Sequence, residues 1–305
     1  MTALLGCIAD DFTGGTDLAG MLVKSGMRTI QMIGVPVGPL PGDVDAVVIA
    51  LKSRTAPAED AITESLAALR YLQSAGCRQF YFKYCSTFDS TPQGNIGPVT
   101  EALMDALGVD FTIACPAFPA NQRTIYKGYL FVGDVLLNES GMRDHPLTPM
   151  KDANLVRVLQ GQATRKVGLV DYTAVSKGAS AIVERFGALR QEGYGFAIID
   201  AVSDDDLVEL GAACADLALV TAGSGVVLGL PRNFRSQGLL ATTSKRTHCQ
   251  TRAACGQSLR AVAPTPRKAK WLPCASIIPR SKSVRQALPR ARTSLPTRLI
   301  GRPRA

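Results

Sequence analysis

The fold is decided by the opening stretch Leu4-Leu5-Gly6-Cys7-Ile8-Ala9-Asp10-Asp11-Phe12-Thr13-Gly14-Gly15-Thr16-Asp17. An apolar run ends at two carboxylates, two glycines follow, and residues 18–25 are amphipathic, which predicts a strand, a polar turn and a helix. Ligands of open α/β sheets bind at the carboxyl ends of strands. The two aspartates therefore mark a candidate binding edge, and the glycines allow a close backbone approach.

Apolar segments and helical patterns alternate through the chain. The expected strands are apolar on both faces, which is typical of a parallel, doubly wound α/β sheet. A strand pair is expected within residues 125–137, with a tight turn at Gly128, and residues 138–152 read as a loop. The expected strands cover residues 29–33, 46–51, 79–84, 111–116, 167–170, 196–201 and 217–221, and the expected helices cover residues 58–75, 98–107, 154–161, 179–192 and 204–215.

Bulk composition indicates a globular protein, because 46% of the 305 residues are apolar. No apolar run approaches the roughly 18 residues of a membrane helix. The N-terminus lacks a basic region and carries acids early, so we expect no signal peptide and a cytoplasmic location. The eight cysteines contain no CxxC pair, which predicts free thiols and neither a disulfide framework nor a zinc site.

Charge is divided sharply along the chain. All 25 acidic residues precede residue 217, whereas residues 241–305 hold 15 of the 34 Lys and Arg and seven prolines. We expect residues 1–240 to fold and residues 241–305 to form a disordered basic tail. Either the tail binds nucleic acid, or it is an out-of-frame product, since shifted GC-rich codons encode Arg, Pro, Ala and Ser. We favour the second, because Trp271 is the tail's only aromatic residue and supplies no base-stacking pattern.

Five motifs in a fixed order closely resemble the four-carbon acid sugar kinase family, and within it the 3-oxo-tetronate 4-kinases. They are IADDFTGGTD at 8–17, LKSRT at 51–55, FKYCSTFDSTPQGNIG at 82–97, CPAFPANQR at 115–123 and GSG at 223–225. The resemblance covers about residues 3–240.

The resemblance implies two domains, of which the first binds the acid sugar and the second binds ATP. The implied reaction is ATP-dependent phosphorylation of the terminal (4-) hydroxyl of an acid sugar such as 3-oxo-tetronate, in carbohydrate catabolism, with Mg²⁺ on the ATP. A D-erythronate or D-threonate kinase and a non-catalytic acid sugar binding domain are the alternatives. No residue of 241–305 matches a nucleotide-binding position, and no metal ligand is assigned. The expected partners are the acid sugar and ATP, with neither nucleic acid nor membrane.

Site residues are expected where polar side chains follow the strands. Asp10 and Asp11 are the catalytic candidates: one acts as a base or hydroxyl clamp, and the other is open to a helix-capping role. Arg54 suits a carboxylate, because its planar fork gives two parallel hydrogen bonds. His145 could act as an acid or base, but we favour an ordinary loop role for it. The expected substrate-binding residues are Thr13, Gly14, Gly15, Thr16, Lys52, Arg54, Lys83, Ser86, Asp89, Asn95 and Arg123.

Overall fold

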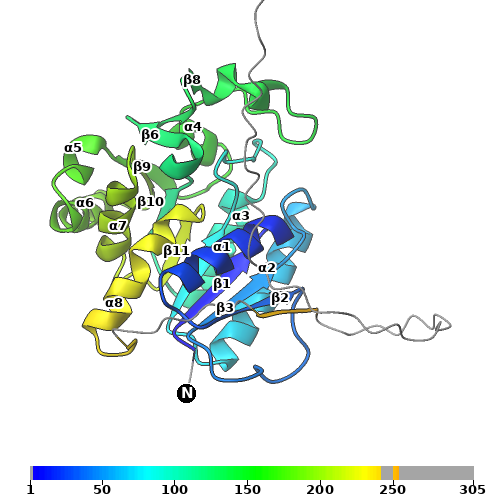
Figure 1. The fold of residues 1–305 in the computed structure, drawn as a ribbon. Coiled ribbons are helices and arrows are strands. Elements are labelled where there is room, and N and C mark those ends of the chain that lie inside the picture. The colour runs from blue at the N-terminus through cyan, green and yellow to red at the C-terminus, as the bar shows by residue number, and fades with distance from the viewer. Residues whose placement is uncertain (1–2, 242–249, 254–305) are drawn as a thin grey trace, which may run out of the picture. The chain divides into compact units, whose positions relative to one another are not determined.

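A nine-stranded parallel sheet forms the centre of the protein, in a computed structural model that describes residues 3–241 and 250–253. Its strand order is β12-β2-β3-β1-β4-β11-β5-β10-β9 (Figure 1). The mainly parallel, doubly wound sheet predicted from the sequence is confirmed. The strands are β1 (Leu5–Ala9), β2 (Thr29–Ile33), β3 (Ala46–Ala50), β4 (Gln79–Lys83), β5 (Thr112–Cys115), β9 (Lys166–Val170), β10 (Tyr194–Ile199), β11 (Leu219–Ala222) and β12 (Gln250–Ala253).

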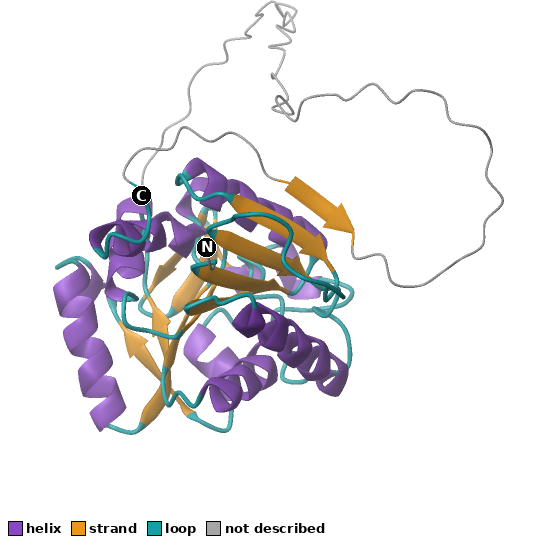
Figure 2. Ribbon diagram, turned by 90° about the horizontal axis from the view of Figure 1, so that it is seen from below, coloured by secondary structure: helices purple, strands orange, loops and turns teal. Residues whose placement is uncertain are grey.

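Helices cover both faces of this sheet (Figure 2). Ser203 caps one of them by a capping box with Asp206, which satisfies backbone donors at the helix start. Asp206 thus belongs to the cap of this helix, α7 (Asp204–Ala213). The helices are α1 (Phe12–Lys24), α2 (Ala58–Ser74), α3 (Ile96–Leu107), α4 (Leu155–Gln160), α5 (Tyr172–Val175), α6 (Ala179–Gln191), α7 (Asp204–Ala213) and α8 (Leu230–Ser236).

Strand β1 lies at the point where the chain changes direction across the sheet. It pairs with β3 on one side and with β4 on the other, in parallel and in register. The chain builds β2 and β3 on the first side before it returns to add β4 on the second. The carboxyl ends of β1 and β4 therefore flank the crevice in which ligands of doubly wound sheets bind.

A small antiparallel sheet of β6 (Arg123–Tyr126), β7 (Tyr129–Val132) and β8 (Val135–Leu136) lies outside the large one. Its first turn uses the left-handed residues Lys127 and Gly128, with φ of 53° and 77°. The buried Asp200 carboxylate accepts the backbone N–H groups of both, at 2.7 and 2.8 Å, and that of Tyr172 at 2.8 Å. Asp200 thereby fastens the hairpin to the end of β10.

Several predicted boundaries are corrected by the structure. Helix α1 begins at Phe12 rather than at residue 18, so the glycine pair lies inside the helix, because Asp11 caps it. The segment 138–152, predicted as a loop, contains 3₁₀ turns at Leu137–Glu139 and Gly141–Asp144. Strand β12 was not predicted, and its backbone pairs with β2. The remainder of the predicted tail, residues 242–249 and 254–305, lies outside the described residues.

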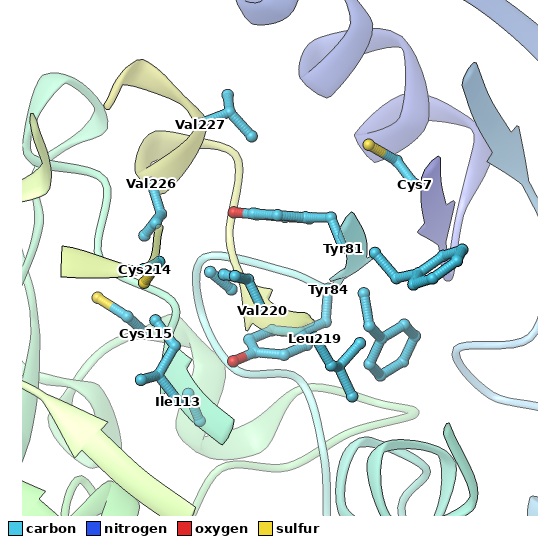
Figure 3. Close-up of a cluster of buried hydrophobic side chains, with 14 of the residues drawn as sticks. Cys7, Tyr81, Tyr84, Ile113, Cys115, Cys214, Leu219, Val220, Val226 and Val227 are labelled. Carbon is cyan, nitrogen blue, oxygen red and sulfur yellow. The ribbon is translucent and has the colours of Figure 1, made fainter. Parts of the chain in front are cut away.

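Buried aromatic and sulfur side chains fill the centre of the core (Figure 3). The Tyr81 hydroxyl donates to the Gly223 carbonyl, and the Tyr84 hydroxyl bonds to that of Thr221. The cysteines at 7, 77, 85, 115 and 214 are free, as predicted. Burial raises the pKa of the Cys115 thiol to about 12, so this sulfur behaves as a small apolar group.

Candidate functional site

Asp10 and Arg54 form a bidentate ion pair beside β1. Arg54 Nε donates to Asp10 Oδ2 at 2.9 Å, and Nη2 donates to Oδ1 at 2.8 Å. The Asp10 carbonyl also accepts the backbone N–H groups of Ser53 and Arg54. The short path from the end of β3 therefore brings the guanidinium onto the carboxylate, and both partners are fixed in orientation.

Asp11 is the N-cap of α1, so the structure assigns it the capping role that the sequence left open. Its Oδ1 accepts the Gly14 N–H at 3.0 Å and Arg54 Nη2 at 2.6 Å. The Nζ of Lys83, from the end of β4, lies 3.9 Å away. A Cβ on Gly14 would lie 2.1 Å from Lys83 Nζ and 2.3 Å from Asp11 Oδ1, so both side-chain ends would have to move.

Asp89 completes a cluster that we call the strand-end cluster: Asp10, Asp11, Arg54, Lys83 and Asp89. The Thr87 hydroxyl donates to Asp89 Oδ1, and Asp89 Oδ2 lies 3.8 Å from Arg54 Nη1. Phe88, which lies between Thr87 and Asp89 in the sequence, has a left-handed backbone with φ of 51°. Its ring is fully buried and packs edge-on against Tyr84, with ring centres 5.4 Å apart.

The electrostatics of the cluster are dominated by Arg54. Burial raises the pKa of the Asp10 carboxyl, and the hydrogen bonds and charge of Arg54 oppose that rise. Burial also acts against the Arg54 cation, but the hydrogen bonds and charge of Asp10 outweigh it and raise the pKa of Arg54. The guanidinium is therefore a permanent cation that holds neighbouring carboxylates.

Asn95 supports the segment that carries Arg54. Its Nδ2 donates to the carbonyls of Ser53, Arg54 and Ala56 at 2.6, 3.3 and 2.9 Å. Its φ is −103°, so its backbone is not left-handed. Asn95 Oδ1 is buried and has no partner in the part of the chain that the structure describes.

A pocket of about 120 Å³ opens beside the cluster, and its lining includes Arg54, Asp89, Asn95, Leu147 and Thr148. Pockets for drug-sized ligands measure roughly 300–1,000 Å³, so this one suits a small molecule. His145 Nδ1 accepts the Thr148 N–H at 3.1 Å, which supports the loop role expected for this histidine. Thr87, Leu147 and Thr148 were missed, because no sequence pattern marks them as close to Arg54.

Several predicted site residues lie apart from the cluster. Thr13 and Lys52 are exposed and Ser86 is half-buried. Thr16 bonds to the Phe12 carbonyl and to Gln31, and Arg123 Nη1 donates to the Asn121 carbonyl. Gly15 packs against strand β3. Between residues 3 and 241, no hydrogen bond or ion pair joins Thr13, Thr16, Lys52, Ser86 or Arg123 to the cluster.

The cluster does not fit a magnesium ion, because Arg54 already bridges Asp10 and Asp11. Within the described ranges, no group of three or more His, Cys, Asp or Glu side chains is arranged to hold a metal. The Gly-Ser-Gly motif at 223–225 follows strand β11. Ser224 is buried, and Cβ atoms on its two glycine neighbours would collide with Pro116 and Leu207, so packing accounts for this motif.

None of the helices among the described residues has both the length and the apolar character needed to span a bilayer. A larger groove of about 750 Å³ runs along the edge strand β9, with Lys177, Glu184 and Arg185 among its lining residues. It contains none of the predicted site residues.

Comparison with known proteins identifies relatives of the described region. A family profile described as "Sugar-binding N-terminal domain" matches residues 5–230. A Burkholderia multivorans protein named 3-oxo-tetronate kinase is 66% identical over 238 residues, which are 78% of this chain and 56% of the relative.

Solved structures support the same fold. A Haemophilus influenzae protein is 56% identical, with a TM-score of 0.74 over 77% of this chain and 56% of its own. A Bordetella bronchiseptica domain solved with bound citrate is 25% identical, with a TM-score of 0.63 over 78% of this chain and 58% of its own. The chain thus spans little more than half the length of the relatives it matches.

Proposed function

The chain belongs to the family of sugar-binding N-terminal domains, and from this we propose that it is the acid-sugar-binding part of an ATP-dependent kinase. The proposed reaction transfers phosphate to the 4-hydroxyl of a four-carbon acid sugar such as 3-oxo-tetronate. Support comes from relatives that carry the name 3-oxo-tetronate kinase at 50–67% identity. A D-erythronate or D-threonate kinase remains the alternative within the same chemistry.

The observation that carries this proposal is the strand-end cluster beside a small polar pocket. An acid sugar offers one carboxylate and several hydroxyls, and the cluster offers two cations and three carboxylates. In the proposal, Arg54 and Lys83 bind the acid group, while Asp10, Asp11 or Asp89 accepts hydrogen bonds from hydroxyls. Citrate, bound in the Bordetella structure, is also a hydroxy acid.

The nucleotide is proposed to bind outside residues 3–241. ATP, with its Mg²⁺, supplies the phosphoryl group and its charge neutralisation. The residues of this chain bind the acceptor and orient its hydroxyl. We also propose a domain boundary near residue 240, a non-native origin for residues 241–305 and a cytoplasmic location.

Calorimetric titration tests the proposal directly. We expect the chain to bind D-erythronate or D-threonate and not the uncharged polyol erythritol, because erythritol lacks the group that Arg54 binds. An Arg54→Lys variant is expected to lose at least about tenfold in affinity, since lysine cannot form the fork. Arg190→Lys, at an exposed pair with Asp110, is the matched control. Equal affinity for the acids and erythritol contradicts the proposal.

A non-catalytic acid sugar binding domain is the second candidate, favoured because no described residue is assigned to ATP. It predicts acid binding with no saturable ATP binding and no phosphate transfer by the same preparation. Saturable ATP binding by this chain would exclude that candidate and would favour the kinase.

A further inference from the structure

The three carboxylates of the strand-end cluster differ in what remains open for a ligand. Both oxygens of Asp10 already accept from Arg54, and its side chain is only 6% exposed. Asp11 accepts the Gly14 N–H and Arg54 Nη2 on one oxygen, Oδ1. Neither lines the pocket, whereas Asp89 does. Asp89 is therefore the carboxylate of the cluster that a molecule in the pocket can reach.

Asp89 is held with one oxygen engaged and one open. Thr87 donates to Oδ1, which fixes the rotation of the carboxylate. The neighbour of Oδ2 is Arg54 Nη1 at 3.8 Å, which is beyond hydrogen-bonding distance. Charge keeps the two groups together, yet the acceptor Oδ2 is left without a donor among the described residues.

Arg54 has complementary capacity left. A guanidinium carries five N–H donors. Those on Nε and Nη2 are taken up by Asp10 and Asp11, while Nη1 faces Asp89. The pocket is thus presented with one open donor group and one open acceptor, side by side.

Strain at Phe88 supports a ligand role for this arrangement. A buried phenylalanine with φ of 51° is uncommon, and such conformations cost of order 1–3 kcal/mol. The conformation is held by burial of the ring against Tyr84 and by the Phe88 N–H bond to the Cys85 carbonyl. It turns the chain so that Asp89 faces Arg54. Strain of this kind is characteristic of ligand sites.

We propose that Arg54 Nη1 and Asp89 Oδ2 together recognise a carboxylate and the hydroxyl on the carbon next to it, which makes Asp89 a specificity residue for 2-hydroxy acids. The inference rests on the proposed function and deepens it. Neighbouring carboxylate and 2-hydroxyl oxygens match a donor and an acceptor only 3.8 Å apart. The terminal hydroxyl of a four-carbon acid lies several bonds further along the chain, away from this pair.

Three acids separate the contributions of the two hydroxyls in calorimetric titrations. They are 2,3,4-trihydroxybutanoate, its 2-deoxy analogue 3,4-dihydroxybutanoate and its 4-deoxy analogue 2,3-dihydroxybutanoate. We expect the wild-type chain to bind the trihydroxy acid about ten- to a hundredfold more tightly than the 2-deoxy acid, the range typical of a hydrogen bond to a charged group.

Asp89→Ala is expected to reduce that preference to within about twofold, because the acceptor is gone. The affinity ratio between the trihydroxy and 4-deoxy acids is expected to stay unchanged. Thr87→Val, which frees Asp89 Oδ1 but keeps the side-chain shape, is expected to give an intermediate loss of the same preference. It provides a second variant in case Asp89→Ala fails to fold.

The possible outcomes separate this inference from the proposed function. An equal loss of affinity for all three acids in both variants overturns the inference, because Asp89 would then act only through the charge or shape of the site. If Asp89→Ala instead removes the preference for the trihydroxy acid over the 4-deoxy acid, Asp89 binds the terminal hydroxyl, and the inference is also overturned. If the wild-type chain binds none of the acids, the proposed function fails with it.

Discussion

Asp10 and Arg54 lie 44 residues apart and are joined by two hydrogen bonds, one to each carboxylate oxygen. The pair links the end of β1 to the segment that follows β3. Because Asp10 is almost completely buried, the guanidinium is what makes its charge tolerable. This pair fixes the remaining donors of Arg54 toward the pocket.

Removing one partner of this pair is expected to cost more than removing both. Arg54→Ala leaves the Asp10 carboxylate buried and unpaired, which should lower the free energy of unfolding by about 3 kcal/mol. The double variant Asp10→Asn/Arg54→Met replaces the pair with uncharged groups and should cost clearly less. Urea unfolding of the two variants measures the difference. Equal losses would show that Asp10 needs no counter-ion.

Gly14→Ala is expected to abolish acid binding. Its Cβ would occupy the positions of Lys83 Nζ and Asp11 Oδ1, so both groups must move. Gly20 lies in the same helix, and a Cβ there meets nothing within 4 Å. Gly20→Ala should therefore keep binding and raise stability by about 0.5–1 kcal/mol, because alanine is the better helix former. Calorimetry and thermal unfolding check both, and unchanged binding by Gly14→Ala would refute the close approach.

At position 88, a glycine variant should be more stable than an alanine variant, which is the reverse of the usual order. Loss of the buried ring is expected to cost about 3–5 kcal/mol in Phe88→Ala. Phe88→Gly should cost about 1 kcal/mol less, since glycine adopts a positive φ without strain. Phe82 is the matched control: it is buried in β4, and its φ is not positive. There glycine should be worse than alanine, and the same order at both positions would argue against strain at Phe88.

Asp200 predicts a pH dependence of stability. Burial raises the pKa of this carboxyl, and hydrogen bonds from Gly128, Lys127 and Tyr172 oppose the rise. A raised folded-state pKa means that the folded protein binds the proton more tightly. The resulting stabilisation is complete below the unfolded pKa of about 3.9 and is lost as pH rises through the folded pKa.

Asp200→Asn removes this titration. We therefore expect the stability of the wild type, measured relative to the variant, to fall as pH rises from about 4. At neutral pH the variant should still be less stable by about 1–3 kcal/mol, because one backbone N–H of the hairpin turn then faces an amide donor. Urea midpoints across pH measure both effects, and a pH-independent difference would contradict the raised pKa.

The sequence was sufficient for the sheet because its strands are buried on both faces. β1 and β3 are apolar throughout, and only a parallel, doubly covered sheet satisfies that pattern. β12 could not be predicted, because no apolar pattern in the sequence marks Gln250–Ala253 as a strand. The start of α1 was misplaced because glycines usually weaken helices, whereas here they make room for Lys83 and β3.

The site was predicted in part, since Asp10, Asp11, Arg54, Lys83 and Asp89 do converge. Residue types and their spacing in the sequence could not show that both carboxylate oxygens of Asp10 accept hydrogen bonds from Arg54. Saturation depends on side-chain directions over 44 residues of separation. The left-handed backbone of Phe88 could not be predicted from the sequence either, because phenylalanine has no propensity for that conformation.

Asn95 is the N-cap of helix α3, and the three hydrogen bonds of its amide tie the segment that carries Arg54 to the start of that helix. A segment already ordered in the free protein has little conformational entropy left to lose when a small molecule arrives. A small ligand makes few contacts. Its affinity therefore depends strongly on how little of the interaction energy is lost in ordering the site. Asn95 thus contributes to the proposed site by holding the Arg54 segment in place.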